Sequence, residues 1–140
     1  MKNDIQITII IPCYNAEKFI GSCLDSLYYQ NVSEDYYEII CVNDFSTDNT
    51  TQIIEQYQKN HSNLKLINLP CNKKQGAARN EGLKAAKGEF VWFVDADDLI
   101  VENIFQDIFK ELAENQLDIL QFNIDVTNPL IYPAIYETNV

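Results

Sequence analysis

The chain has 140 residues, 46% of them hydrophobic and 22% charged, which is the composition of an ordinary globular domain with enough residues to bury a core. Its formal net charge of −11 counts against a nucleic acid or an anionic membrane as its main partner, because both require clustered Lys and Arg. The four cysteines form no CxxC pair, which argues against a zinc site. Two of them lie in or beside apolar runs, which suits reduced core thiols in a cytoplasmic protein.

Strand-type and helix-type segments alternate along the chain. Apolar runs rich in β-branched residues predict strands at residues 5–11, 37–43, 64–69 and 90–94, with a candidate fifth strand at 117–123. Apolar side chains three and four residues apart predict helices over residues 16–30, 46–60 and 76–86, and a last helix that begins near Val101. Asn15 is the expected N-cap of the first helix, and Gly88 the expected stop of the third. The alternation predicts an α/β, Rossmann-like fold with a mostly parallel sheet and helices on both faces.

Residues 124–140 break this alternation. They are apolar, contain Pro129 and Pro133, and have no clear helix or strand pattern. Because domain boundaries are more often polar, we expect this stretch to begin a further part of a longer protein.

Polar motifs follow three of the predicted strands: "PCYN", "NDFSTD" and "DADD". Since ligands bind at the carboxyl ends of strands in such sheets, we expect Asp44 to face Asp95 and Asp97 across one pocket. Asp95 and Asp97 are two residues apart and project to the same side of an extended segment, whereas Asp98 points elsewhere. Two carboxylates without a nearby His or Cys suit Mg²⁺ or Mn²⁺. The alternative is an acidic first turn of the following helix, which is the preferred interpretation for Asp98.

The segment "KKQGAARNEG" combines cations with small residues. A helix N-terminus there would point free N–H groups at anions, and Arg79 would add a planar fork for phosphate. The alternative is a solvated loop before an ordinary helix. Tyr14 is either an aromatic residue at the pocket rim or a platform for a nucleobase that donates an N–H to Asp44.

These motifs together resemble the family-2 glycosyltransferases, whose catalytic domain has the GT-A fold. The matching segments are P-x-Y-N, the acidic turn around Asp44, and "GAARNEGLKAAKGEFVWFVDADD". Two positions depart from the family pattern, since Asn43 replaces an acid and Phe45 replaces a glycine. The resemblance implies a nucleotide-sugar-binding half over residues 1–123, followed by an incomplete acceptor-side part over residues 124–140.

The resemblance also implies roles for individual residues. Pro12, Tyr14 and Asp44 would hold the base, Arg79 would lie near the nucleotide, and Asp95 with Ala96 would contact the donor. Asp97, together with Asp95, would bind the Mg²⁺ or Mn²⁺ that bridges the diphosphate.

The implied activity is inverting transfer of a sugar, with a UDP-sugar as the first candidate donor, to a hydroxyl of a glycan or lipid-linked acceptor in polysaccharide or cell-surface glycan synthesis. The catalytic base is expected downstream of this chain. The implied location is the cytoplasm, with peripheral association of the full-length protein with the inner face of the membrane, and no nucleic-acid partner is expected.

Other classes remain open from the sequence. A donor-binding fragment or an inactive nucleotide-binding module fits the expected truncation of the chain as well as an enzyme does. A phosphoacceptor receiver domain also places acids at strand ends, but no Lys follows a strand end here. A nucleotidyltransferase would need a first loop rich in glycine and arginine, which the sequence lacks.

Overall fold

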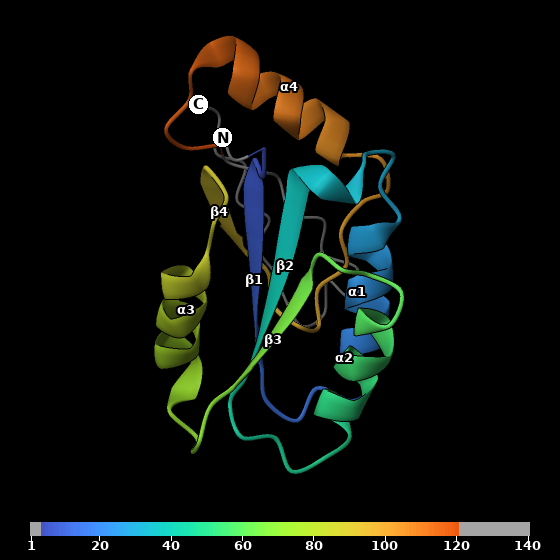
Figure 1. Ribbon diagram of the computed structural model, residues 1–140, viewed down its shortest axis with the longest axis vertical. Coiled ribbons are helices and arrows are strands. Elements are labelled where there is room, and N and C mark those ends of the chain that lie inside the picture. Colours follow the sequence, from blue (N-terminus) through green and yellow to red (C-terminus); the bar gives the residue numbers. More distant parts are fainter. Residues whose placement is uncertain (1–3, 121–140) are drawn as a thin grey trace, which may run out of the picture. The chain divides into compact units, whose positions relative to one another are not determined.

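A computed structural model describes residues 4–120, whose strands form one parallel sheet in the order β3-β2-β1-β4 (Figure 1). The strands are β1 (Ile7–Cys13), β2 (Tyr37–Asn43), β3 (Leu64–Asn68) and β4 (Phe90–Phe93). The helices are α1 (Ile20–Tyr28), α2 (Thr50–Gln58), α3 (Lys74–Ala85) and α4 (Phe105–Asn115), with a 3-10 turn at Glu34–Tyr36. The predicted α/β class and parallel sheet are confirmed. The strand order reverses between β1 and β4, so that ligand binding is expected near their carboxyl ends.

Helices cover both faces of the sheet, as predicted (Figure 1). On one face, Ala78 of α3 packs in a buried cluster with Ile10 of β1 and Ile40 of β2. α1 and α2 lie on the opposite face and contact each other. β1 and β2 are consequently buried along their whole length, which explains why their sequences are continuously apolar rather than alternating.

Two glycines allow α3 and its following loop to approach β1 closely. A Cβ at Gly82 would lie 2.5 Å from Cγ2 of Ile10, and one at Gly88 would lie 2.4 Å from the backbone nitrogen of Thr8. The prediction that Gly88 stops the helix was wrong: α3 ends at Ala85, and its C-cap residue Ala86 is extended. Gly88 instead permits a backbone crossing over β1, where its N–H donates to the Thr8 hydroxyl.

The start of α1 also differs from its prediction. The helix begins at Ile20 rather than near residue 16, and the residue at its N-cap position is Phe19. Asn15 lies earlier, with a left-handed φ of 46°, and its side-chain oxygen accepts from the N–H of Thr47 at 2.8 Å. Asn15 therefore joins two loops and does not cap the helix.

The segment before α4 is fixed by one side chain. The Gln30 side-chain oxygen accepts from the N–H groups of Ile104 and Phe105 at 2.9 and 3.2 Å, and its amide donates to the carbonyl of Val101 at 2.8 Å. These bonds satisfy helix-end donors, and they explain why α4 begins at Phe105 rather than near Val101.

The remaining predictions concern the end of the chain. Residues 117–120 form no strand, and 121–123 lie outside the described residues, as do 124–140. The predicted boundary at residue 123 therefore stays a prediction. The chain divides into two compact units, residues 1–109 and 110–140. No helix within residues 4–120 is long and apolar enough to cross a membrane.

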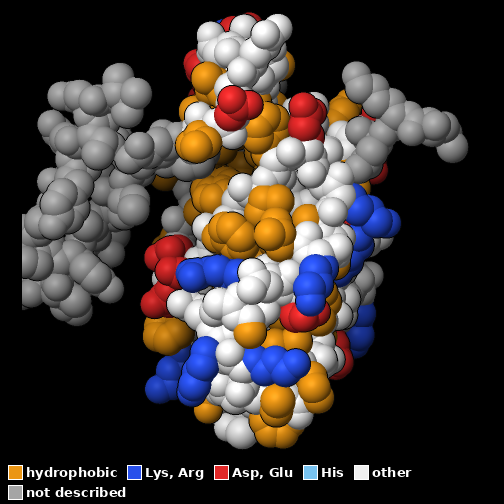
Figure 2. Space-filling view, turned by 90° about the vertical axis from the view of Figure 1, so that its left-hand side faces the viewer, with side chains coloured by type: hydrophobic (Ala, Val, Ile, Leu, Met, Phe, Trp, Pro, Cys, Tyr) orange, Lys and Arg blue, Asp and Glu red, His pale blue; other side chains and the backbone are white. Residues whose placement is uncertain are grey.

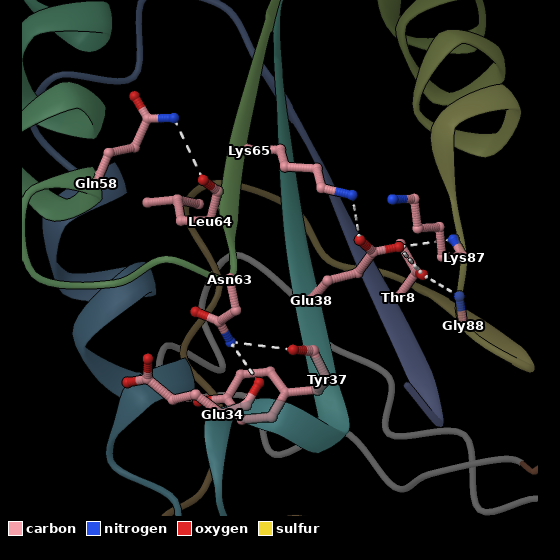
Figure 3. A network of polar contacts seen from close by, with 10 residues as sticks. All are labelled: Thr8, Glu34, Tyr37, Glu38, Gln58, Asn63, Leu64, Lys65, Lys87 and Gly88. Atoms are coloured by element: carbon pink, nitrogen blue, oxygen red, sulfur yellow. Dashed lines mark hydrogen bonds and ion pairs between the residues drawn. The ribbon is translucent and has the colours of Figure 1, made fainter. Parts of the chain in front are cut away.

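A buried carboxylate organises the amino-terminal end of the sheet (Figure 3). Glu38 of β2 is 1% exposed, and its oxygens accept from the Thr8 hydroxyl at 2.7 Å, the Lys65 ammonium at 2.7 Å and the Lys87 N–H at 2.6 Å. Burial alone would raise the pKa of Glu38, but the hydrogen bonds from Lys65, Thr8 and Lys87 outweigh it and lower the pKa. Glu38 thus ties β1, β2, β3 and the loop before β4 together.

Candidate functional site

A cavity of about 350 Å³ lies at the carboxyl ends of β1, β2 and β4. Six of the seven residues predicted to contact donor or metal line it: Pro12, Tyr14, Asp44, Asp95, Ala96 and Asp97. Residues of the three strand-end motifs therefore meet at one cavity, as expected. Among the described residues that line the cavity, none is Lys or Arg, so its charged side chains are all acidic.

The loops after β1 and β2 are joined by hydrogen bonds in both directions. The N–H of Asn15 donates to the Ser46 hydroxyl at 3.0 Å, and the N–H of Ala16 donates to the Thr50 hydroxyl at 2.8 Å. Asp48 accepts from the N–H of Glu17 at 3.2 Å, and in the opposite direction the N–H of Asn49 donates to the Glu17 carboxylate at 3.1 Å. This wall of the cavity is therefore preorganised before any ligand arrives.

Asp44 is buried, at 4% exposure, and its two oxygens are already engaged. They accept from the N–H of Lys73 at 2.6 Å and from the N–H of Lys74 at 2.9 Å, at the start of α3. The prediction that this helix N-terminus offers free N–H groups to a phosphate is wrong for these two donors, because Asp44 occupies them. Each carboxylate oxygen accepts more than one hydrogen bond, so Asp44 can anchor α3 and still face a ligand.

The two departures from the family pattern beside Asp44 have structural explanations. The side-chain amide of Asn43 donates to Asn68 at 2.9 Å and Thr51 at 3.1 Å, while its oxygen accepts from the N–H of Ser46 at 3.1 Å. A carboxylate at position 43 would lack both donors. Phe45 has a left-handed φ of 63°, the conformation that glycine adopts most readily. Phe45 is also 53% exposed. The turn thus keeps its conformation without the glycine.

The three acids after β4 form one cluster, which corrects the expected separation of Asp98. One carboxylate oxygen from each of Asp95, Asp97 and Asp98 lies within 4.8 Å of the others. Asp98 also precedes Phe105, where α4 begins, by seven residues, so the preferred interpretation as an acid of the first helical turn was wrong. Burial, followed by the negative charges of Asp95 and Asp97, raises the pKa of Asp98.

Arg79 supplies a positive partner from within the chain. Its Nη2 lies 3.2 Å from Oδ1 of Asp95, and its guanidinium carbon lies 5.9 Å from the ring centroid of Phe93. Arg79 does not line the cavity, so it reaches the predicted ligand residues through Asp95. One Arg facing three carboxylates leaves the cluster short of positive charge.

The cluster fits a hard divalent cation. Its ligands are carboxylate oxygens on a four-residue turn, which suits Mg²⁺ or Mn²⁺. The thiol of Cys23 lies close by and donates to the backbone oxygen of Asp95 at 3.7 Å. Burial, with smaller contributions from Cys13 and the three acids, raises the pKa of Cys23 to about 12, so this thiol is protonated at neutral pH.

Sequence reasoning missed several lining residues. Phe19 and Ala16 come from the segment before α1, and Gln75 and Ala78 come from α3. The spacing of Gln75 and Ala78, three residues apart on one helix, places them on one face and was the available signal. Cys13 also lines the cavity, although it is only 1% exposed.

Comparison with known proteins gives the family. The profile of Glycosyl transferase family 2 matches residues 8–137. A poly(ribitol-phosphate) beta-glucosyltransferase of Bacillus spizizenii is 44% identical over 116 residues, which cover 82% of this chain and 18% of that protein.

Solved structures agree with this result. Staphylococcus aureus TarS superposes with a TM-score of 0.84 and 38% identity, over 89% of this chain and 22% of TarS. Residues 1–349 of TarS in complex with UDP-GlcNAc give a TM-score of 0.76 and 41% identity, over 80% and 32% of the two chains. The mannosyltransferase PcManGT of Pyrobaculum calidifontis, in complex with GDP-Man and Mn²⁺, gives a TM-score of 0.71 and 30% identity, over 78% of this chain and 32% of PcManGT.

The chain thus spans about a fifth to a third of the length of these relatives. The family match nevertheless extends over the sheet and over all of the motifs that line the cavity. This chain belongs to glycosyl transferase family 2.

Proposed function

We propose that this chain is the donor-binding part of a glycosyltransferase that uses a UDP-sugar, and that the whole protein transfers the sugar to a hydroxyl of a polyol-phosphate or related cell-surface glycan. The observation that carries the proposal is the convergence of Asp44, Asp95 and Asp97 on one cavity. The donor nucleotide follows from the relative solved with UDP-GlcNAc, and the acceptor class follows from the relatives named for poly(ribitol-phosphate).

The base would lie between Tyr14 and Asp44 in this proposal. The Tyr14 residue is 54% exposed at the cavity, so its ring is free to stack on a pyrimidine. Asp44 is held rigidly by the N–H groups of Lys73 and Lys74, and it would accept an N–H from the base. A carboxylate fixed before binding loses little entropy when the base arrives.

Asp95 and Asp97 would hold the divalent cation, with Asp98 at its margin. A bound Mg²⁺ or Mn²⁺ supplies charge neutralisation for the leaving nucleoside diphosphate. Arg79 orients Asp95 through its ion pair and holds that carboxylate at the cavity. The Mn²⁺ in the PcManGT complex supports this choice of metal.

Inversion at the sugar carbon would need a base to take the proton of the acceptor hydroxyl. Each carboxylate that lines the cavity is already engaged elsewhere, since Asp44 anchors α3, Asp95 pairs with Arg79, and Asp97 belongs to the acid cluster. The base is therefore expected outside residues 4–120.

Three of the four cysteines are buried and unpaired, which supports a cytoplasmic location.

Calorimetric titration with UDP, GDP and dTDP in the presence of Mn²⁺ tests the donor. We expect UDP to bind most tightly, and binding of none of the three would contradict the proposal. The second candidate is a binding module without transfer activity, favoured by the lack of an unassigned carboxylate in the cavity. A transfer assay on these 140 residues and on the full-length protein separates the two, because transfer by either would exclude the binding module, and transfer by the 140 residues alone would place the base within them.

A further inference from the structure

The positive charges of this acidic protein are concentrated on one side. Residues 65–87 contain six of the ten Lys and Arg and one of the 21 Asp and Glu, which gives this segment a charge of +5 against −16 for the rest of the chain. These cations include five lysines that we call the basic face: Lys65, Lys73, Lys74, Lys84 and Lys87. The net charge of −11 had argued against an anionic partner, but it conceals this asymmetry.

The basic face is a grouping in space as well as in sequence. Figure 2 views the molecule from the α3 side and shows several separate Lys and Arg side chains over the middle and lower parts of this face. Lys73 and Lys74 begin α3, Lys84 lies near its end, and Lys87 follows in the loop beyond. The 12 residues of α3 span about 18 Å, so the charges extend along the whole helix.

Several of these charges are available to a partner. Lys73, Lys74 and Lys84 are exposed, and within residues 4–120 no ion pair includes Lys73 or Lys74. Lys84 pairs with Glu81 on the surface at 3.0 Å, a contact worth well under about 1 kcal/mol. Because charges act over a Debye length of about 8 Å at physiological salt, a partner on this face responds to the local charge rather than to the net charge.

One end of the basic face lies at the cavity. Gln75 and Ala78, on the first turns of α3, line the cavity, and Lys73 and Lys74 directly precede them. A linear anion lying along α3 would therefore end at the place where the donor is expected. A membrane fits this surface less well, because the exposed positions of α3 include a single large apolar side chain, Leu83.

We propose that the basic face binds the phosphodiester backbone of the acceptor polymer and leads its end toward the donor cavity. The proposal rests on the proposed function, since a polyol-phosphate acceptor is the linear polyanion that the charge pattern fits. The lysines would contact phosphates without reading the sugar, so binding should weaken steeply with salt.

A fluorescently labelled ribitol-phosphate oligomer tests this on the 140-residue chain by anisotropy over a series of NaCl concentrations. The variant K73Q/K84Q removes two charges from the basic face, and the matched control K18Q/K59Q removes two exposed charges that lie outside α3. We expect the first variant to bind the oligomer about tenfold more weakly at low salt. The slope of its log binding constant against log NaCl concentration should become smaller in magnitude by about 2, whereas the control should change little.

Equal weakening in both variants, or in neither, would overturn the proposal, as would stronger binding to phosphatidylglycerol vesicles than to the oligomer. Thermal unfolding of both variants verifies that they remain folded. Calorimetry with UDP separates this proposal from the donor assignment: normal UDP binding by K73Q/K84Q with weakened oligomer binding supports the basic face, whereas absence of UDP binding in the parent chain contradicts the donor proposal alone.

Discussion

Carboxylates at the two ends of the sheet differ in how many positive and hydrogen-bonding partners they have. At the amino-terminal end, Glu38 is buried and receives three hydrogen bonds from Thr8, Lys65 and Lys87 (Figure 3). At the carboxyl-terminal end, three acids share one turn and a single Arg. The same functional group thus stabilises the fold where its partners are supplied, and raises the energy of the folded state where they are missing.

The sign of the pKa shift distinguishes these two roles. The pKa of Glu38 is lowered by its partners, whereas burial and neighbouring acids raise the pKa of Asp98. Removing charge should therefore destabilise the first region and stabilise the second. Asp44 lies between the two cases, since it is buried and satisfied like Glu38 but lines the cavity.

The largest effect is expected from Gly88→Ala at the amino-terminal end. The added Cβ would meet the Thr8 backbone nitrogen at 2.4 Å and the Ile7 carbonyl carbon at 2.7 Å, and backbone atoms cannot move aside cheaply. We expect a loss of about 3 kcal/mol or more in the free energy of unfolding, measured by urea denaturation. Gly76→Ala is the control, because nothing lies within 4 Å of its added Cβ; equal losses would contradict the close crossing.

Glu38→Gln should cost about 2 kcal/mol at neutral pH, because it removes the ion pair with Lys65 and places an amide against the ammonium group. The pKa of Glu38 in the folded protein lies below the ordinary glutamate value of 4.5. Its contribution to the free energy of unfolding is therefore complete above pH 4.5 and is lost as the pH falls through the folded pKa. The stability difference between the wild type and the variant should therefore shrink below about pH 4.5.

Glu34→Gln is the matched control for Glu38. Glu34 pairs with His61 at 2.7 Å, but its side chain is 38% exposed. We expect a cost below about 1 kcal/mol. Urea denaturation across the acidic range measures both variants, and a larger effect at position 34 would reverse our ranking of the two carboxylates.

Asp44→Ala should cost about 1–2 kcal/mol in stability, because the N–H groups of Lys73 and Lys74 lose their acceptor at the start of α3. It should also weaken UDP binding, since the α3 wall of the cavity depends on that anchor. Thermal unfolding and calorimetry measure the two effects. Retention of full stability would show that the anchor contributes nothing to the fold.

Asp98→Asn should have the smallest effect, a stabilisation of about 0.5 kcal/mol at neutral pH through relief of repulsion by Asp95 and Asp97. Because the folded pKa of Asp98 is raised, the gain should disappear as the pH falls and the wild-type carboxyl takes up a proton. Urea denaturation at neutral and acidic pH measures this gain. Destabilisation at neutral pH would contradict the account of an underpaired cluster.

Local sequence was sufficient for the sheet but not for the pairing of its charges. The apolar runs predicted all four strands, and the strand-end motifs predicted which residues meet at the cavity. The partners of Glu38 are 27 to 49 residues away along the chain, so no local pattern reveals them. The acid within "YEIICVN" and the Lys within "LKLINL" were the available signals, and they become informative once the register of β2 and β3 is known.

Similar reasons explain the errors at Asn15, Gly88 and Asp98. Each residue has a helix-end propensity, but tertiary contacts determine its role: a bond to Thr47, a crossing over Thr8, and a cluster with Asp95 and Asp97. The charge asymmetry of α3 was present in the sequence, but a net charge averaged over the chain conceals it.

The most direct test of the central claim is calorimetric titration of the wild type and Asp97→Asn with UDP, with and without Mn²⁺. If the carboxyl-terminal acids serve a cation and its ligand, UDP should bind the wild type more tightly with Mn²⁺, and the substitution should abolish that gain while leaving the unfolding temperature unchanged or higher. UDP binding that is indifferent to both Mn²⁺ and Asp97 would contradict the account.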